Sequence, residues 1–101
     1  MPWSGLPNHL DLTASDLDRS VAFYDVLLGR LGYVRDQVYA GSVPAWAWRG
    51  HGPSFSIGLH RAASKQAHDR RAPGFHHLAF HVGSRAEVDA YARDAPMPRA
   101  E

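Results

Sequence analysis

Polar and apolar residues alternate from His9 to Ala14, with His9, Asp11 and Thr13 on one face and three apolar residues on the other. This period of two is typical of a strand that buries one face. The pattern therefore predicts a strand with a histidine at its start.

The next stretch changes to the spacing of a helix. Asp16 and Asp18 place negative charge at the predicted N-terminus, where the helix dipole favours it, and Ser15 is the expected N-cap. Gly32 is the expected C′ residue. The apolar residues recur at steps of four, three, four and three and form one stripe: Leu17, Val21, Tyr24, Leu28 and Leu31. We predict a helix that begins at about Asp16 and ends before Gly32.

Three strands are predicted after this helix, over residues 33–39, 43–49 and 54–61. Turn-forming residues separate them, Gly41-Ser42 before the second and Gly50 to Pro53 before the third. Residues 62–73 are polar, basic and aperiodic, which indicates a linker.

The opening pattern then returns in part. Leu78, Phe80 and Val82 alternate with polar or small residues, which predicts a strand over 77–82. A helix is expected from about Ser84, with Val88 and Tyr91 facing inward. In this second copy, His77 takes the place of His9.

The predicted order is β-α-β-β-β, a linker, and β-α, which is an α+β fold in a single domain over residues 1–101. A complete βαβββ unit covers 8–61, and a second unit over 74–101 stops after its helix. A ferredoxin-like βαββαβ domain is the alternative.

Composition narrows the class of protein. The chain has 101 residues, of which 45% are hydrophobic and 21% charged, as in an ordinary globular domain. It has no cysteine, a net charge of +1 without a basic stripe, and no apolar run long enough to span a membrane. We expect no nucleic-acid partner and no membrane insertion, and we expect a cytoplasmic location.

Two motifs carry a family resemblance. The run H-L-x-L-x-x-x-D-L-D-R-S-V-A-F-Y-x-x-x-L-G extends from His9 to Gly29, and P-G-F-H-H-L-A-F extends from Pro73 to Phe80. They resemble the starts of the two modules of the glyoxalase/bleomycin-resistance/extradiol-dioxygenase group, the vicinal oxygen chelate superfamily. The resemblance covers residues 8 to 92. It implies curved mixed sheets that enclose a cleft, with the helices on the convex side.

The resemblance also implies a metal site. Matched to the family's ligand positions, His9 and His77 would bind a divalent metal ion such as Fe, Zn, Mn, Ni or Co. The fourth-strand position, where the family often has a carboxylate, is Gly58, and the eighth-strand position would lie beyond Glu101. Two of the four expected ligands are therefore present.

Other candidate site residues come from the strand pattern. Asp11 lies one pleat past His9, roughly 6.6 Å away, and His60 lies one pleat past Gly58 on the same face. Either could transfer protons. Trp46 and Trp48 share a strand face and could form a flat surface for a ligand, although two such residues also suit a core or a dimer interface.

Two functions stay open. One is a metal-dependent lyase, isomerase or dioxygenase that acts on a small substrate with vicinal oxygens. The other is a metal-free protein that binds or sequesters a drug or aromatic ligand, as bleomycin-resistance proteins do. Because the strand over 77–82 would have an open edge, we expect a homodimer or pairing with a missing C-terminal fragment.

Overall fold

The fold is α+β, as predicted. The computed structural model describes residues 3–36, 43–50, 52–64, 66–67 and 69–94. Its elements are β1 His9–Ala14, α1 Leu17–Arg30, β2 Val34–Arg35, β3 Ala45–Trp48, β4 Phe55–Arg61 and α2 Arg85–Arg93. Three strands follow α1 in a row, as the βαβββ order requires. Part of the strand predicted over 33–39 lies outside the described residues.

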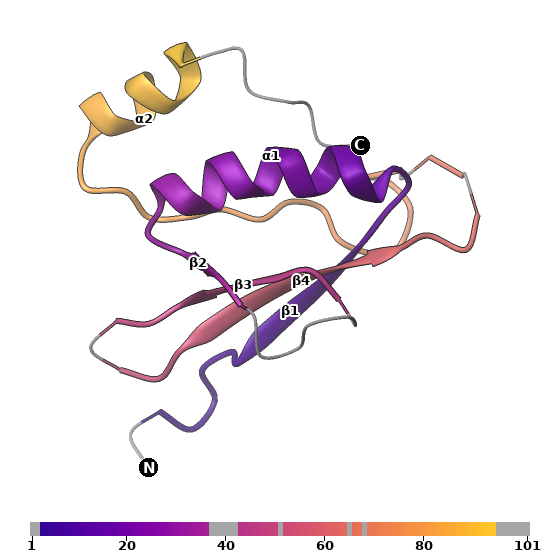
Figure 1. Ribbon diagram of the computed structural model, residues 1–101, viewed down its shortest axis with the longest axis horizontal. Helices are drawn as coiled ribbons and strands as arrows, with labels where there is room; N and C mark the ends of the chain where they lie inside the picture. Colours follow the sequence, from indigo (N-terminus) through magenta and orange to yellow (C-terminus); the bar gives the residue numbers. More distant parts are fainter. Residues whose placement is uncertain (1–2, 37–42, 51, 65, 68, 95–101) are drawn as a thin grey trace.

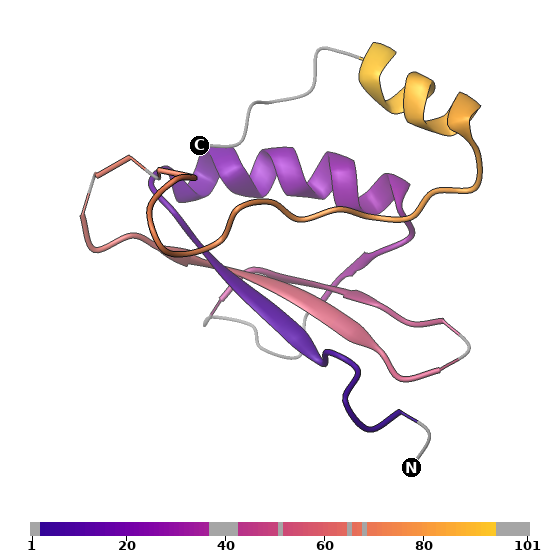
Figure 2. The ribbon, with the colours of Figure 1, turned by 180° about the vertical axis from the view of Figure 1, so that it is seen from behind.

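The four strands form one curved, unclosed mixed sheet in the order β1-β4-β3-β2. β1 and β4 are parallel, and the other two pairs are antiparallel. Both helices lie on the same side of the sheet, α1 directly against it and α2 further out (Figures 1 and 2). The opposite face of the sheet is covered by none of the described elements.

The core lies between α1 and the sheet. Leu28 of α1 is fully buried against Trp46, Ile57 and Leu59 of β3 and β4. The predicted apolar stripe of α1 points at this cluster, with Leu17, Val21, Tyr24 and Leu31 around it. Burial raises the pKa of the Tyr24 hydroxyl, because the ionised form would lose solvation.

The two ends of α1 explain why the helix has these limits. Asp16, and not the predicted Ser15, is the N-cap, and its carboxylate accepts from the backbone N–H of Arg19 at 3.2 Å. Both residues are good caps, so the sequence could not separate them. Gly32 is the C′ residue with a φ of +95°, as predicted, and the Tyr33 N–H donates to the Leu28 carbonyl at 2.9 Å.

The strand predicted over 77–82 does not form. Residues 74–83 run as an irregular extended segment alongside α1, on the helix side of the sheet (Figures 1 and 2). Phe80 packs against the core, with its ring 6.1 Å from that of Tyr33. The sequence of this segment does alternate, but its backbone pairs with no strand among the described residues. It contacts the core through individual side chains such as Phe80.

The second helix is only partly as expected. Ser84 is its N-cap and accepts from the N–H of Glu87, as the sequence indicated. Val88 is 53% exposed, so the prediction that it faces inward is wrong. Tyr91 is half-buried beneath the guanidinium of Arg30. Neither described helix is long and apolar enough to cross a membrane.

Candidate functional site

An open pocket of about 350 Å³ lies on the face of the sheet opposite α1. The strand register produces it, because Asp11 pairs with Gly58 and Thr13 with His60 across β1 and β4. Ala45 of β3 pairs with Gly58 from the other side. The polar residues and the glycine that line the pocket are Asn8, His9, Asp11, Ser56, Gly58 and His60.

The Asp11 carboxylate lies directly over Gly58. A Cβ atom at position 58 would be 2.6 Å from Asp11 Oδ1, closer than real Cβ atoms come to a neighbour. Glycine at this position therefore makes room for the carboxylate of the adjacent strand. The pocket thus has a carboxylate at the level of Gly58, although Gly58 itself supplies none.

Two histidines flank this carboxylate. His60 Nε2 is 3.5 Å from Asp11 Oδ1, and His9 Nε2 is 3.9 Å from Asp11 Oδ2. Each imidazole thus faces a different oxygen, and all three side chains are about half exposed. Because water screens these contacts, they add little stability, and the arrangement is better suited to binding or proton transfer.

Asn8 orients His9. Its Oδ1 is 2.9 Å from His9 Nδ1, and because an amide oxygen only accepts, the contact is a hydrogen bond in the tautomer that carries its proton on Nδ1. In that tautomer Nε2 has a free lone pair, and it lies 3.9 Å from Asp11 Oδ2. Sequence reasoning missed Asn8, because a residue before a strand has no fixed direction until the chain is folded.

Comparisons with known proteins identify the family of this chain. The family model of the Glyoxalase/Bleomycin resistance protein/Dioxygenase superfamily matches residues 6–95. The chain belongs to this superfamily. The sequence had already suggested it through the motifs that begin at His9 and Pro73.

One solved structure supports the assignment. The chain is similar to a candidate glyoxalase from Bacillus halodurans, with 28% identity and a TM-score of 0.77. The match covers 91% of this chain and 68% of that one. A comparison with curated proteins gave no match.

The metal pair expected of a superfamily member is not brought together. The segment that carries His77 runs on the helix side of the sheet, whereas His9 faces the open side (Figures 1 and 2). His77 Nδ1 lies 2.8 Å from His76 Nδ1, and no residue of 74–94 lines the pocket of His9. Among the described residues, no group of three or more His, Asp or Glu is placed to hold a metal ion. This arrangement does not fit the implied site, in which His9 and His77 would bind the same metal ion.

The two predicted ligand-binding tryptophans lie on the helix side of the sheet. Trp46 is 1% exposed, and its indole N–H donates to Asp25 Oδ1 of α1 at 2.7 Å. Arg35 Nη1 lies 3.3 Å from the same oxygen. This position favours the alternative of a core residue for Trp46. Trp48 is 41% exposed, and a role in binding stays a prediction for it. Asp25 gave no sequence signal beyond its place on a helix.

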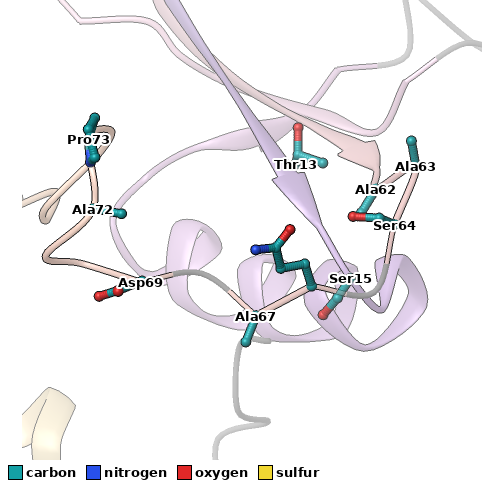
Figure 3. Close-up of a pocket in the computed structure, with 10 residues that line it drawn as sticks. Thr13, Ser15, Ala62, Ala63, Ser64, Ala67, Asp69, Ala72 and Pro73 are labelled. Carbon is teal, nitrogen blue, oxygen red and sulfur yellow. The ribbon is translucent and has the colours of Figure 1, made fainter.

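A larger hollow of about 720 Å³ lies between the loop over 62–73 and the end of β1. Figure 3 shows Ala63 and Ser64 on one side of it, Asp69 and Ala72 on the other, and Thr13 at the strand end. Small side chains dominate, and Asp69 points away from the centre. Its polar lining residues are Thr13, Ser15, Ser64, Gln66 and Asp69, of which only Asp69 is titratable, so the hollow lacks the carboxylate and imidazole groups that meet in the Asp11 pocket and is a weaker candidate.

Proposed function

We propose that this chain binds a small molecule with neighbouring hydroxyl or amine groups in the pocket around Asp11. The observation that carries the proposal is the Asp11 carboxylate, which lies over Gly58 with a histidine beside each oxygen. The two oxygens of a half-exposed carboxylate can accept hydrogen bonds from a ligand with at least two donors. This is the metal-free binding alternative, with the binding surface on the open face of the sheet.

His60 and Ser56 would complete the binding surface. Both lie on β4 beside Gly58, and both line the pocket. The His60 imidazole lies beside the Asp11 carboxylate, with 3.5 Å between Nε2 and Oδ1, where it could exchange a proton with a bound hydroxyl. The pocket could therefore support proton transfer on a vicinal diol as well as binding.

A metal-dependent lyase, isomerase or dioxygenase is the second candidate. One observation favours it: in the tautomer that donates from Nδ1 to Asn8 Oδ1, His9 Nε2 has a free lone pair, as a metal-ligating histidine requires. This candidate needs at least one ligand in addition to those that the described residues bring together.

The test uses catechol as the probe and veratrole, its dimethyl ether, as the ligand without donors. Catechol should shift the amide resonances of Gly58 and His60 in NMR spectra, and veratrole should not. Asp11→Asn should weaken catechol binding about tenfold, since a charged acceptor is lost. Asp18→Asn, an exposed carboxylate on α1, should leave binding unchanged. Equal binding of both probes, or no effect of Asp11→Asn, would contradict the proposal.

Elemental analysis separates the two candidates. Protein purified without chelator should contain less than stoichiometric metal if the binding function is correct. One metal per chain, lost in His9→Ala and kept in His76→Ala, would favour the metalloenzyme.

We also propose that the chain works in the cytoplasm and associates as a homodimer. The exposed side chains of Phe75 and Leu78 support the association, because they leave apolar surface beside β1 at the edge of the sheet. Light scattering that shows a stable monomer would contradict the association.

A further inference from the structure

A third cavity, of about 500 Å³, lies on the helix side of the sheet. Three parts of the chain line this open site: the N-terminal segment before β1, the turn between β3 and β4, and the segment after His77. It shares no lining residue with the pocket around Asp11. Its large lining side chains are all apolar: Trp3, Leu6, Trp48, Phe55, Leu78 and Phe80.

Exposed apolar side chains concentrate at this cavity. Of the eight large hydrophobic residues that are exposed in the described part of the chain, four line it, namely Trp3, Leu6, Trp48 and Leu78. Exposed apolar residues that gather in a concave site, rather than lying scattered, are typical of a ligand-binding surface.

The local backbone holds the two tryptophan rings in place. A turn with Gly5 at a φ of +94° returns the chain, so that the Leu6 N–H donates to the Trp3 carbonyl at 3.0 Å. The Trp48 ring fills the space that a Cβ atom at Gly50 would need. The Trp3 ring lies beside Gly52, where an added Cβ atom would be in ordinary van der Waals contact, 3.5 Å from Trp3 Nε1.

We propose that this cavity binds an uncharged, planar aromatic molecule of about two rings. Rings of Trp and Phe on several sides offer both stacked and edge-on contacts to a flat ligand. Because no charged side chain of the described residues lines the cavity, a charged ligand would lose solvation without compensation. This ligand class differs from the hydroxyl-bearing molecule proposed for the Asp11 pocket, and the two sites are independent.

The probe for the test is 6-propionyl-2-(dimethylamino)naphthalene, an uncharged dye with two fused rings whose emission moves to shorter wavelength in apolar sites. It should bind the wild-type chain at one site and quench tryptophan fluorescence. Leu6→Arg should weaken binding at least about tenfold, since it removes apolar contact and adds a charge. The matched control is Val88→Arg on α2, which is also exposed but does not line the cavity. It should bind the dye as the wild type does.

Two further variants keep the test decisive. Trp3→Ala should weaken dye binding without unfolding the chain, because Trp3 is 46% exposed and lies before β1. Gly50→Ala should also weaken it by displacing the Trp48 ring. Asp11→Asn should have no effect, which distinguishes this site from the open-face pocket. Unchanged dye binding in Leu6→Arg and Trp3→Ala, or equal loss in Val88→Arg, would overturn the proposal.

Discussion

The region from β1 to β4 and the region from residue 74 to 94 are built in different ways. In the first, the sheet and α1 bury a shared cluster that includes Leu28 and Ile57, both at 0% exposure. In the second, α2 has no buried residue, and Leu78 is 39% exposed. The two regions resemble each other in sequence, yet only one of them has hydrogen-bonded strands among the described residues.

The difference shows what a repeated pattern can specify. Alternation assigns side chains to two faces, but a strand also needs a neighbour whose backbone pairs with it. β1 has β4 as that neighbour, in register from His9 to Ala14. Residues 77–82 have the alternation alone, so their apolar side chains pack individually along α1.

The largest expected effect contrasts a leucine from each region. Leu28→Ala should lower the free energy of unfolding by about 2–5 kcal/mol, because it leaves a cavity in the core. Leu78→Ala should cost less than about 1 kcal/mol, because its side chain is only partly buried. Urea unfolding followed by circular dichroism measures both. Equal losses would mean that the second region belongs to the same cooperative core.

A second prediction concerns the contact that joins α1 to the sheet. Asp25→Ala removes the acceptor of the buried Trp46 N–H and should cost about 1–3 kcal/mol. The matched control is Asp89→Ala, an exposed carboxylate on α2 of the second region, which should stay within about 0.5 kcal/mol. In a Trp46→Phe background the cost of Asp25→Ala should shrink, since the indole N–H is gone. If Asp25→Ala lowered the free energy of unfolding by the same amount in that background, its cost would come from the lost contact with Arg35.

Sequence patterns predicted the first region closely. The alternation over His9 to Ala14 matched β1 residue for residue, and Gly32 ended α1 as expected. These predictions were correct because each depends on local sequence alone. One rests on a single buried face of a strand, and the other on a helix end with a residue that tolerates a positive φ. The strand over 77–82 failed because its outcome depends on a pairing partner, which local pattern does not encode.

The candidate site was predicted only in part. The face shared by His9, Asp11 and His60 followed from strand period, and the structure brings all three side chains together. The placing of Asp11 over Gly58 needed the β1–β4 register, because those residues are far apart in the sequence. The expected pairing of His9 with His77 rested on the second region, where the fold departs from the repeat.

A third prediction uses two glycines of the first region. Gly32→Ala should cost about 1 kcal/mol, because its φ of +95° is strained for a residue with a Cβ atom. Gly29→Ala, three residues earlier within α1, should instead stabilise by about 0.5–1 kcal/mol, since nothing lies within 4 Å of an added Cβ. Thermal unfolding of the two variants should shift in opposite directions. If the melting temperatures of both variants shifted in the same direction, Gly32 would not be the residue at which α1 ends.

The smallest effect on global stability is expected at Arg30, which joins the two regions. Its guanidinium lies 3.9 Å from the centroid of the Tyr91 ring, and its Nη1 lies 3.1 Å from Asp94 Oδ2. Both contacts are partly exposed, so Arg30→Ala should cost less than about 1 kcal/mol globally. Amide exchange in Arg85–Arg93 should nevertheless accelerate, because α2 has no buried residue to hold it once this contact is lost.

Arg93→Ala serves as the control at the end of α2, and it should leave exchange in the first turns of that helix unchanged. If Arg30→Ala instead lowered global stability as much as Leu28→Ala, α2 would belong to the core, and the contrast between the two regions would be wrong.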